Sequence, residues 1–397
     1  MLFQTFDDKT NCNAMYANNK LYFKGLPKNL TKTWSYSESL KDNHDIEYAQ
    51  IYCNGQTLDE ACPPHLQNDW EKVKKRLIAF HRSCEETQLN LNDHCLYDMI
   101  PRFFLKDLAC IKNKICGFVF SHYEKPKNYE FTLQLVKILT EIKNTKLNVD
   151  YSELNDRLYE FKIRRFVLNN KKNLPYINYD PFKTKTGRLT TRLNSFPILT
   201  MDKSYRKILK PKNGWFMEFD FNAAELRVLL GLLGKEQPQE DIHAWNAKNV
   251  YRELTTREEA KKRIFAWLYN PKSKDYLSNR AYDRDSVVQK YYNGNQVSTF
   301  FTRTIEADDH HALNYILQST AADLFFKQMI KVWELLQDRK SRIAFCLHDS
   351  LIIDYCEEDN DILVKLKKVF SDTDLGNFMV NVSAGEHYGN MNKLSIK

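Results

Sequence analysis

The sequence predicts an α+β fold, and strand and helix patterns in its second half carry that prediction. The apolar run WFMEFDF reads as a β-strand with Asp220 near its end. The segment FCLHDSLIID has apolar residues on both sides of a polar tip that contains Asp349, which predicts a tight hairpin. Helices are predicted for residues 255–270 and 310–336, because apolar side chains recur there at helical spacing.

Composition indicates a globular protein of two or three domains. The chain has 397 residues, of which 43% are hydrophobic and 13% aromatic, so it is not a disordered tail. Its formal net charge of +8 permits nucleic-acid binding without requiring it. The start, MLFQTFDDKT, carries acids where a signal peptide carries bases, and no apolar run approaches about 18 residues. We expect a soluble cytoplasmic protein with no membrane attachment.

Nine cysteines, none in CxxC spacing, predict reduced thiols and no disulfide framework. Six Cys and His residues could in principle form a zinc site, but their intervals match no familiar template, which favours buried thiols. These residues are Cys53, Cys62, His81, Cys84, His94 and Cys95.

The first part of the chain looks like an α/β domain. Strand-like runs occur at 1–6, 20–25 and 48–53, and a helical pattern covers 69–82. We find no strand that carries Asp-x-Glu.

The segment 255–270 predicts one helix with an unusual face. Arg257, Lys261, Phe265 and Tyr269 recur every fourth residue, so two cations and two rings form one stripe. Cations bind phosphates, and rings stack on sugar and base, so this stripe suits a nucleoside triphosphate. The alternative is an amphipathic helix with solvated basic residues and buried rings.

Five motifs follow one another in the second part of the chain: TKTGRLTT from Thr184, WFMEFDFNAAELRVLLGLLG from Trp215, the helix at 255–270, LQSTAADLFFKQM from Leu317 and FCLHDSLIID from Phe345. In order, spacing and chemistry they resemble family A DNA polymerases, the DNA polymerase I family. The resemblance covers roughly residues 147–397. It implies a right-hand fold with an antiparallel palm, helical fingers and a small thumb.

The resemblance also implies a domain order. The expected parts are a degenerate exonuclease-like or structural α/β domain at 1–127, a reduced thumb at 128–180, palm at 181–241, fingers at 242–309 and palm again at 310–397. The helical pattern from Tyr129 to Val149 would open the thumb. Five basic residues between Lys162 and Lys172 would contact phosphates, although a solvated helix face explains them equally well.

The resemblance implies roles in the reaction for six side chains. Asp220 and Asp349 would hold two Mg²⁺ ions, and Lys261 would act as general acid toward departing pyrophosphate. Arg257 would neutralise the terminal phosphates. Phe265 would pack on the sugar, and Tyr269 would stand near the templating base.

Further contacts follow from the resemblance. Glu225 would lie under the incoming sugar and exclude ribose, although Asn222 three residues earlier also makes a capping-box pattern. His243 and Arg206 would contribute to the deoxynucleotide site. The residues expected to contact DNA are Arg188, Asn314, Gln318 and His348.

This chain departs from the family at Ser350, where the family often has Glu, so we assign no third metal carboxylate; Glu218 and Asp354 are candidates without support. The compact fingers resemble polymerases of tailed phages, which implies a bacterial host cell. Expected partners are primer-template DNA, dNTPs and a processivity factor or separate exonuclease, and we expect a monomer. Two alternatives stay open: a relative of single-subunit RNA polymerases, disfavoured by Glu225, and a catalytically inactive nucleic-acid-binding protein.

Overall fold

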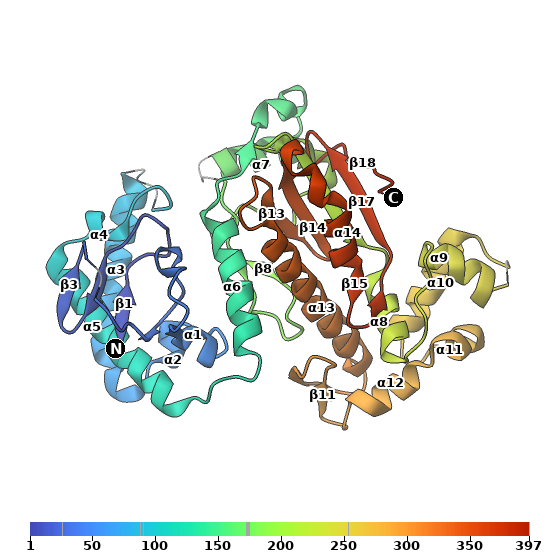
Figure 1. Cartoon of the computed structure of the whole chain (residues 1–397), viewed down its shortest axis with the longest axis horizontal. Coiled ribbons are helices and arrows are strands. Elements are labelled where there is room, and N and C mark those ends of the chain that lie inside the picture. The colour runs from blue at the N-terminus through green and yellow to red at the C-terminus, as the bar shows by residue number, and fades with distance from the viewer. Residues whose placement is uncertain (26, 88, 90, 172–174, 253, 397) are drawn as a thin grey trace. The chain divides into compact units, whose positions relative to one another are not determined.

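The chain folds as two compact units, Met1–Lys146 and Leu147–Lys397 (Figure 1). The structure is a computed structural model and describes the whole chain except residues 26, 88, 90, 172–174, 253 and 397. The division lies later than our boundary after residue 127, because helix α6 (Tyr129–Asn144) adds Tyr129 and Leu133 to a core of the first unit. The assignment of α6 to a thumb and the finer domain limits stay predictions.

The first unit contains a three-stranded antiparallel meander of β1 (Phe3–Thr5), β2 (Met15–Ala17) and β3 (Lys20–Tyr22). Asn18 and Asn19 join β2 to β3 with φ values of 48° and 59°, the left-handed conformation that two-residue hairpins require. The same unit also contains a parallel pair of two short strands, 32–33 and 47–48, together with helices, and the α/β prediction for this part of the chain stays a prediction.

The segment 48–53, which we predicted to be a strand, is mostly the short helix α1 (Ala49–Tyr52). The backbone N–H of Gly55 donates to the carbonyl of Gln50 over 2.7 Å, and Asn54 and Gly55 both have positive φ. An Asn-Gly pair in this conformation closes a helical turn. The prediction was wrong because this local closing signal outweighed the alternating pattern.

Long helices complete the first unit. Helix α5 (Arg102–His122) contacts β1 and β2, and α3 (Gln67–Glu86) packs against α5. Helix α3 confirms the helix predicted for 69–82. The remaining elements are β4 (Lys32–Thr33), η1 (Glu38–Leu40), β5 (Glu47–Tyr48), α2 (Leu58–Ala61), η2 (Pro64–Leu66) and α4 (Leu96–Met99).

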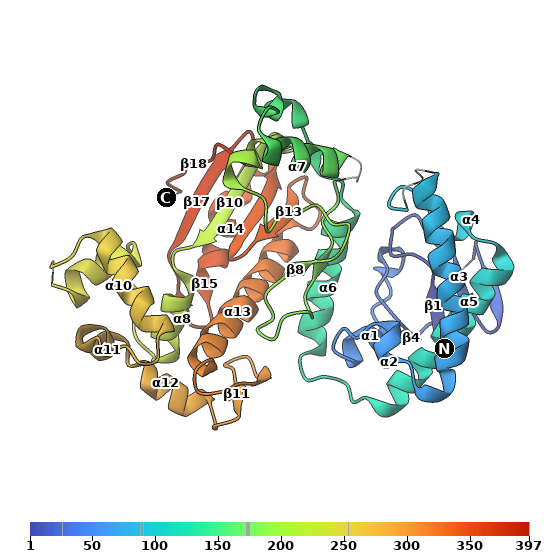
Figure 2. The ribbon, with the colours of Figure 1, turned by 180° about the vertical axis from the view of Figure 1, so that it is seen from behind.

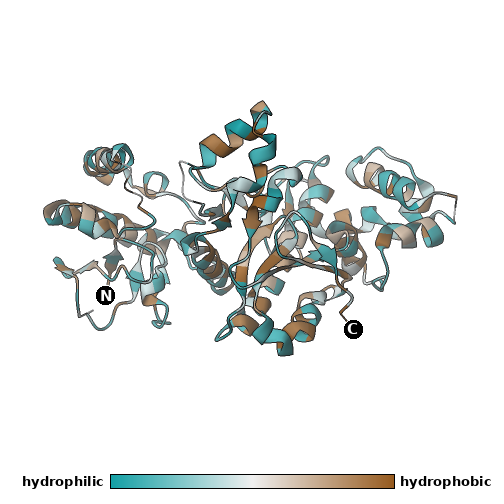
Figure 3. Ribbon diagram, turned by 90° about the horizontal axis from the view of Figure 1, so that it is seen from above, coloured by the Kyte–Doolittle hydropathy of each residue, from teal (hydrophilic) through white to brown (hydrophobic). Residues whose placement is uncertain are grey.

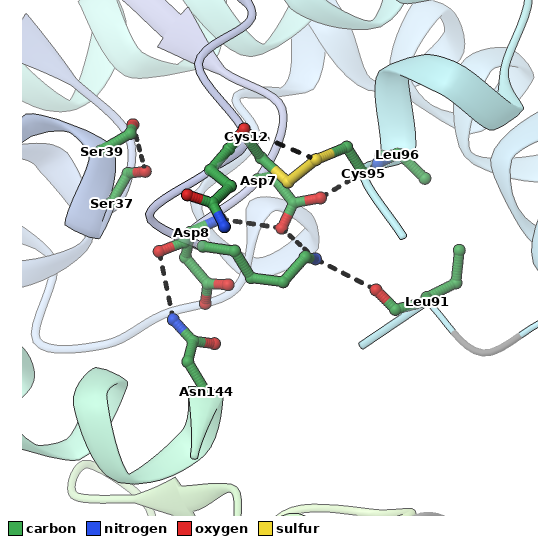
Figure 4. The surroundings of a disulfide bond; sticks show 11 residues. Asp7, Asp8, Cys12, Ser37, Ser39, Leu91, Cys95, Leu96 and Asn144 are labelled. Carbon is green, nitrogen blue, oxygen red and sulfur yellow. Dashed lines mark hydrogen bonds and ion pairs between the residues drawn. A yellow bond between two sulfur atoms is a disulfide. The ribbon is translucent and has the colours of Figure 1, made fainter. Parts of the chain in front are cut away.

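Cys12 and Cys95 form a disulfide across a sequence separation of 83 residues (Figure 4). Our expectation of reduced thiols is therefore wrong for this pair, because the fold brings together two cysteines that no sequence spacing relates. The zinc candidates Cys53, Cys62 and Cys84 are free and buried. Within the part of the chain that the structure describes, no three Cys, His, Asp or Glu side chains are grouped as metal ligands.

The second unit is built on a five-stranded antiparallel sheet in the order β13-β14-β10-β17-β18. Its middle strand is β10 (Trp215–Phe221), which confirms the predicted strand. The hairpin of β13 (Arg342–Leu347) and β14 (Ser350–Tyr355) confirms the predicted hairpin. The outer strands are β17 (Val380–Gly385) and β18 (Asn392–Lys393), and the sheet carries long hydrophobic stretches (Figure 3).

Helices α13 (Ala312–Leu336) and α14 (Leu363–Ser371) pack on this sheet (Figures 1 and 2). The Phe370 ring on α14 lies 5.9 Å from that of Phe219 on β10 and 6.2 Å from that of Phe325 on α13, between ring centroids. Helix α13 confirms the helix predicted for 310–336. Across the described residues, no helix is both long and apolar enough to span a membrane.

Short helices connect β10 to α13. They are α8 (Ala224–Leu232), α9 (Ile242–Trp245), the π-helical turn η5 (Asn246–Val250), α10 (Arg257–Tyr269), α11 (Tyr276–Tyr282) and α12 (Arg284–Tyr291), followed by the hairpin of β11 (Gln296–Ser298) and β12 (Thr304–Glu306). The fully buried Arg227 guanidinium organises the connection after α8. It donates to the carbonyl oxygens of Asn222, Pro238 and Glu240 over 2.7, 2.7 and 2.9 Å.

Before β10 the chain forms small elements: β6 (Asn148–Val149), η3 (Tyr151–Arg157), α7 (Phe161–Lys171), β7 (Tyr179–Asp180), β8 (Thr190–Thr191), η4 (Lys203–Ile208) and β9 (Leu209–Lys210). The predicted basic segment is helix α7. Arg164 and Arg165 are exposed on it, as is Phe161. Lys172 lies outside the described residues. An exposed basic face agrees with both interpretations of this segment.

Candidate active site

The two predicted metal carboxylates lie on neighbouring strands. Asp220 is near the end of β10, and the antiparallel register pairs it with Ser350, the first residue of β14. Asp349 directly precedes Ser350, in the two-residue turn that links Leu347 to Ser350. The other turn residue, His348, has φ of 56°, a left-handed value that is uncommon outside glycine. Strand pairing therefore places both carboxylates at the same end of these two strands, which agrees with the prediction that Asp349 lies opposite Asp220.

The environment of these carboxylates disfavours their charge. Burial, followed by repulsion from Asp220, raises the pKa of Asp349 to about 6. Burial also raises the pKa of Asp220, although the Ser350 hydroxyl donates to its Oδ1 over 2.8 Å. No Lys, Arg or His of the described residues forms an ion pair with either. Arg188 lines the same cavity as Asp349 and partly offsets the rise in its pKa, but neither carboxylate is neutralised by an ion pair with a described residue.

The donor chemistry fits a divalent cation. Mg²⁺ prefers oxygen ligands and is commonly held by one or two carboxylates, with water and substrate phosphates completing its shell. Asp220 and Asp349 supply such oxygens, and a cation between them would relieve the repulsion that raises the pKa of Asp349. The pair fits the predicted metal role without a third carboxylate.

The two further carboxylates differ in position. Glu218 shares a strand face with Asp220, accepts from the hydroxyl of Tyr388 over 3.2 Å, and has its pKa raised by burial and then by Asp220. Asp354 pairs with Phe216 near the opposite end of β10, and its carboxylate accepts from the backbone of Lys212 over 3.0 Å. Glu218 therefore lies on the same face of β10 as Asp220, whereas Asp354 binds the backbone of the loop before β10.

Glu225 does not cap helix α8. The residue that precedes the helix, Ala223, has φ of 54° and offers no side-chain cap, so the capping-box alternative with Asn222 is wrong. Instead, the Glu225 carboxylate accepts from the guanidinium of Arg188 and from the hydroxyl of Tyr269. A non-glycine residue in the left-handed region costs about 1–2 kcal/mol. The strained turn lies between Asp220 and Glu225, and joins two predicted site residues.

The predicted stripe forms on α10. Its opposite face is buried through Ala260, Ile264, Trp267 and Leu268. The stripe itself is not part of that core, since the side chain of Tyr269 is 44% exposed and the ring of Phe265 is half-buried. These two rings stack with centroids 5.8 Å apart and an interplanar angle of 8°. The alternative of an amphipathic helix with buried rings does not describe this helix.

The cations of the stripe differ in their surroundings. Arg257 donates to both carboxylate oxygens of Asp241, over 3.0 and 2.8 Å. Lys261, one turn further along, is exposed and makes no ion pair with the residues the structure describes. Arg257 must therefore exchange Asp241 for any phosphate that it binds, whereas Lys261 is available.

His243 lies beside this stripe. Its ring centroid is 5.4 Å from that of Phe265, and the residue is 4% exposed. Burial lowers its pKa to about 4, so the imidazole is neutral at pH 7. Asp241 caps α9 by accepting from the backbone of His243 over 3.1 Å. A neutral ring can donate one hydrogen bond to a phosphate but adds no charge.

A cavity of ≈ 140 Å³ joins elements that are distant in the sequence. Its polar lining includes Arg188, Glu225, His348 and Asp349. On α13, Ala321 and Ala322 line the same cavity, and they follow Gln318 by three and four residues, so Gln318 shares their helix face. Asn314 lies one turn earlier on that face, and its side-chain oxygen is buried and has no hydrogen-bond partner among the described residues. The predicted DNA-contacting residues therefore surround or approach one cavity.

Arg206 lies on another side of the site. Its guanidinium is 5.1 Å from the ring centroid of Tyr388, the residue that donates to Glu218. With Arg188 it contributes to a lowered pKa of His348, for which burial is the main cause. Its described contacts thus join Arg206 to Glu218 and His348, and not to the stripe on α10.

Sequence reasoning missed the pair Arg303 and Asp323. Asp323 is 3% exposed on α13 and accepts from Arg303 over 2.5 and 3.1 Å. Gly187, with φ of 78°, lies against this guanidinium: a Cβ at Gly187 would be 2.6 Å from Nη2 of Arg303. The pair therefore supports the backbone next to Arg188. The carboxylate in LQSTAADL was the available signal, since a buried Asp requires a partner.

The fold is that of a polymerase domain. The structure is similar to the POL domain of Pol1 from M. smegmatis in complex with DNA primer-template and dNTP, with a TM-score of 0.54 at 15% sequence identity. The similarity covers 72% of this chain and 76% of that one.

Curated relatives are DNA polymerases I. The chain is 24% identical to that of Borreliella burgdorferi over 260 residues, 52% of this chain and 29% of the relative. It is 24% identical to that of Chloroflexus aurantiacus over 287 residues, 58% and 30% of the two chains, and 25% identical to the thermostable one of Thermus aquaticus over 244 residues, 49% and 29%. The matches span less than a third of these relatives. No protein-family model matches the chain. The predicted resemblance to family A DNA polymerases is confirmed.

Proposed function

We propose that this protein is a template-directed DNA polymerase that adds dNTPs to a primer 3′ end by phosphoryl transfer. The observation that carries the proposal is the pair Asp220 and Asp349, two carboxylates at the ends of neighbouring strands that form no ion pair with the described residues. The curated relatives are named DNA polymerases, and the solved domain was bound to primer-template and dNTP, which supports the same substrates.

Asp220 and Asp349 would hold two Mg²⁺ ions. When bound, such ions lower the pKa of an attacking hydroxyl and neutralise charge on the phosphates. The protein contributes the fixed positions of the two carboxylates through the register of β10 and β14. The Ser350 hydroxyl donates to Oδ1 of Asp220 over 2.8 Å, and the side-chain amide of Asn381 donates to Oδ2 over 3.5 Å, so both bonds orient the carboxylate.

The α10 stripe would bind the triphosphate. Arg257 would move from Asp241 to the terminal phosphates, and Lys261 would donate a proton to departing pyrophosphate. Phe265 would pack on the sugar, with the neutral His243 beside it as a hydrogen-bond donor to phosphate. Arg206 interacts with Glu218 and has no described contact with the α10 stripe. Its expected contact with the incoming nucleotide stays a prediction.

Glu225 would select the sugar. Its carboxylate is held by Arg188 and Tyr269, so it occupies a defined position next to the cavity that includes Asp349. A fixed acceptor there would exclude a ribose 2′-hydroxyl by contact. Tyr269, at the end of the stripe, would stand near the templating base.

Arg188, Asn314, Gln318 and His348 would contact the primer-template. Arg188 and His348 line one cavity, and Gln318 lies on the face of α13 that borders it, with Asn314 one turn earlier. This arrangement supports contacts to minor-groove acceptors, which report pair geometry without reading the base sequence. The side-chain amides of Asn314 and Gln318 each carry an N–H group that can donate to such acceptors.

Several finer predictions accompany this proposal. The first unit would be a degenerate exonuclease-like or structural domain without proofreading activity. The reduced thumb would leave α7 to grip the duplex, so a processivity factor or separate exonuclease would assist a monomeric enzyme. A role in phage DNA replication in a bacterial cell also stays a prediction.

Primer extension with dNTPs or rNTPs tests the proposal against both alternatives. A polymerase extends with dNTPs, an RNA polymerase relative prefers rNTPs, and an inactive binder extends with neither. Glu225→Ala should increase ribonucleotide use at least about tenfold, equivalent to about 1.4 kcal/mol. Glu225→Gln is the matched control, because it keeps the side-chain volume. An unchanged dNTP-to-rNTP ratio in Glu225→Ala would contradict the assigned role.

A further inference from the structure

Lys112 occupies a core-facing position of helix α5 in the first unit. The residues three and four positions before it and after it are Leu108, Ala109, Ile115 and Cys116, and all four are buried. Helical periodicity therefore calls for an apolar residue at 112. Lys112 is itself partly buried. Lysine is rarely placed among buried residues without a partner, so its presence at this position requires an explanation.

The described residues give Lys112 no neutralising carboxylate. Two carboxylates line the same pocket, but each is paired with another lysine, Asp7 with Lys9 and Asp8 with Lys143. Burial lowers the pKa of Lys112 to about 8. The protein thus maintains an unpaired ammonium group at a place where its charge is unfavourable.

Lys112 faces a pocket of ≈ 290 Å³, at the small end of the range of ligand pockets. The walls come from β1, α3, α5, α6 and the segment before α4. Besides Lys112, the pocket is lined by side chains that can donate hydrogen bonds: Thr5, Ser35, His81, Lys143 and Asn144. Burial lowers the pKa of His81, which keeps that ring neutral at pH 7.

The wall of this pocket is held in place by several bonds (Figure 4). The ammonium group of Lys9 bridges Asp7 and the carbonyl of Leu91, and the backbone N–H of Leu96 donates to Asp7 over 3.0 Å. The disulfide of Cys12 and Cys95 links the same two segments. Asp7 is therefore fully engaged in wall structure, and the pocket is preformed.

We propose that this pocket binds the phosphate group of a phosphate monoester, with Lys112 as its principal cation. With Asp7 and Asp8 neutralised by their own lysines, Lys112 leaves the pocket one positive charge, and Lys143 has further N–H groups to donate. Phosphate suits donors that converge from several elements better than a planar carboxylate does. The phosphate could belong to a free mononucleotide or to the 5′ end of a DNA strand.

Calorimetric titration of the full chain separates these sources. The probes are inorganic phosphate, deoxyadenosine 5′-monophosphate, citrate, and one oligonucleotide with a 5′-phosphate or a 5′-hydroxyl. Binding of phosphate and the mononucleotide indicates a small-molecule site, and tighter binding of the 5′-phosphorylated strand than of its hydroxyl form indicates a strand end. Either outcome supports the proposal. Binding of citrate alone, or of no probe, overturns it.

The variants Lys112→Met and Lys112→Gln should weaken phosphate binding at least tenfold. Lys114→Met is the matched control, because Lys114 carries the same charge on the same helix but is exposed, and its affinity should stay within twofold. Unchanged binding in both Lys112 variants would overturn the proposal.

Thermal unfolding distinguishes a binding role from a structural one. A lysine retained for a ligand costs stability in the free protein, so Lys112→Met should melt at the same temperature as the parent or higher without phosphate. Phosphate should raise the melting temperature of the parent and of Lys114→Met, but not of Lys112→Met. A lowered melting temperature in both Lys112 variants would show that the lysine supports the fold, and would contradict the proposal.

Discussion

Among the described residues, each unit has partly buried charges that form no ion pair, and their sign differs between the two units. In the second unit the unpaired charges are the carboxylates Asp220 and Asp349, and in the first unit it is the ammonium group of Lys112. Two other buried charges are compensated within the protein: Asp323 is paired with Arg303, and the Arg227 guanidinium donates to three backbone carbonyls. Since an unpaired buried charge costs stability, its retention marks a place where a ligand of the opposite sign binds. The comparison therefore predicts a cation site in one unit and an anion site in the other.

The largest expected effect concerns the carboxylates. Asp220→Asn or Asp349→Asn should lower the rate of primer extension at least about 1,000-fold, equivalent to about 4 kcal/mol, because each removes a metal ligand. Primer-template binding, measured by fluorescence anisotropy, should stay nearly intact, and metal-free stability should not fall. Asp354→Asn changes a carboxylate at the other end of the strand and is the control for loss of fold. A rate within about tenfold of the parent would contradict the metal assignment.

The proposed anion site around Lys112 predicts that the stability of the folded protein depends on pH. The pKa of Lys112 is lowered from 10.5 to about 8, so the protonated group destabilises the folded state below pH 8. This cost falls as pH rises from about 8 to 10.5, because the folded protein loses the proton first. Lys112→Met should therefore be more stable by about 2–3 kcal/mol at pH 7, and the difference should disappear near pH 10.5.

Denaturant unfolding at several pH values measures this difference. The titratable groups that line the same pocket are Asp7, Asp8, Lys9, His81 and Lys143, and the Cys116 thiol also acts on Lys112. All of them are present in both proteins, so their contributions largely cancel. Lys114→Met should follow the parent. A constant difference between pH 7 and 10.5 would indicate packing and not charge.

The ion pair of Arg303 and Asp323 should act differently from the unpaired charges, because it supports the backbone at Gly187 and does not bind a ligand. Gly187→Ala should reduce kcat/KM for primer extension about 30- to 100-fold, since its Cβ would meet the Arg303 guanidinium next to Arg188. Gly234→Ala is the matched control, with φ of 67° and open space around the position. It tests backbone strain without the clash.

A second background tests the role of the ion pair. Replacing both partners, as Arg303→Met with Asp323→Leu, removes the charges together and avoids leaving one of them buried alone. Gly187→Ala should then cost about 1 kcal/mol less than in the parent, measured as a double-mutant cycle. If Gly187→Ala has the same effect in the parent and in this background, Arg303 does not act through Gly187.

The smallest effect is expected for exposed charge. Reversing the charges of Arg164 and Arg165 on α7 should weaken primer-template binding about tenfold at physiological salt. The affinity should also depend less steeply on salt, because each phosphate contact contributes about 0.9 to the slope of log affinity against log salt concentration. The control reverses two exposed lysines on α14, Lys365 and Lys368. Equal losses in both variants would show that α7 contributes only net charge.

Sequence patterns predicted the core of the second unit well. Asp220 and Asp349 could be placed because strand alternation and hairpin signals are local, and the stripe on α10 because helical spacing is local. The motifs then related these segments to each other through the family resemblance. The partners of Glu225 could not be predicted, since Arg188 and Tyr269 are distant in the chain and only the fold brings them to one carboxylate.

The first unit shows where such patterns fail. Residues 48–53 formed a helix because an Asn-Gly turn closed it, and the bond between Cys12 and Cys95 joins segments that no motif relates. Lys112 was visible as a lysine between apolar helix positions, yet its significance depends on which carboxylates are already paired, and that is a property of the folded unit.

The register of β10 has a consequence for how this protein can vary in length. Side chains alternate between the faces of a strand, so one inserted or deleted residue before Asp220 would move its carboxylate to the opposite face and pair every later position differently. β10 is paired on both sides, and no neighbouring edge can absorb the shift. The turn at Asn293 and Gly294, before the two-stranded hairpin, is not constrained in this way. Length variants should therefore accumulate near that turn and be absent from β10, even where substitutions are tolerated there.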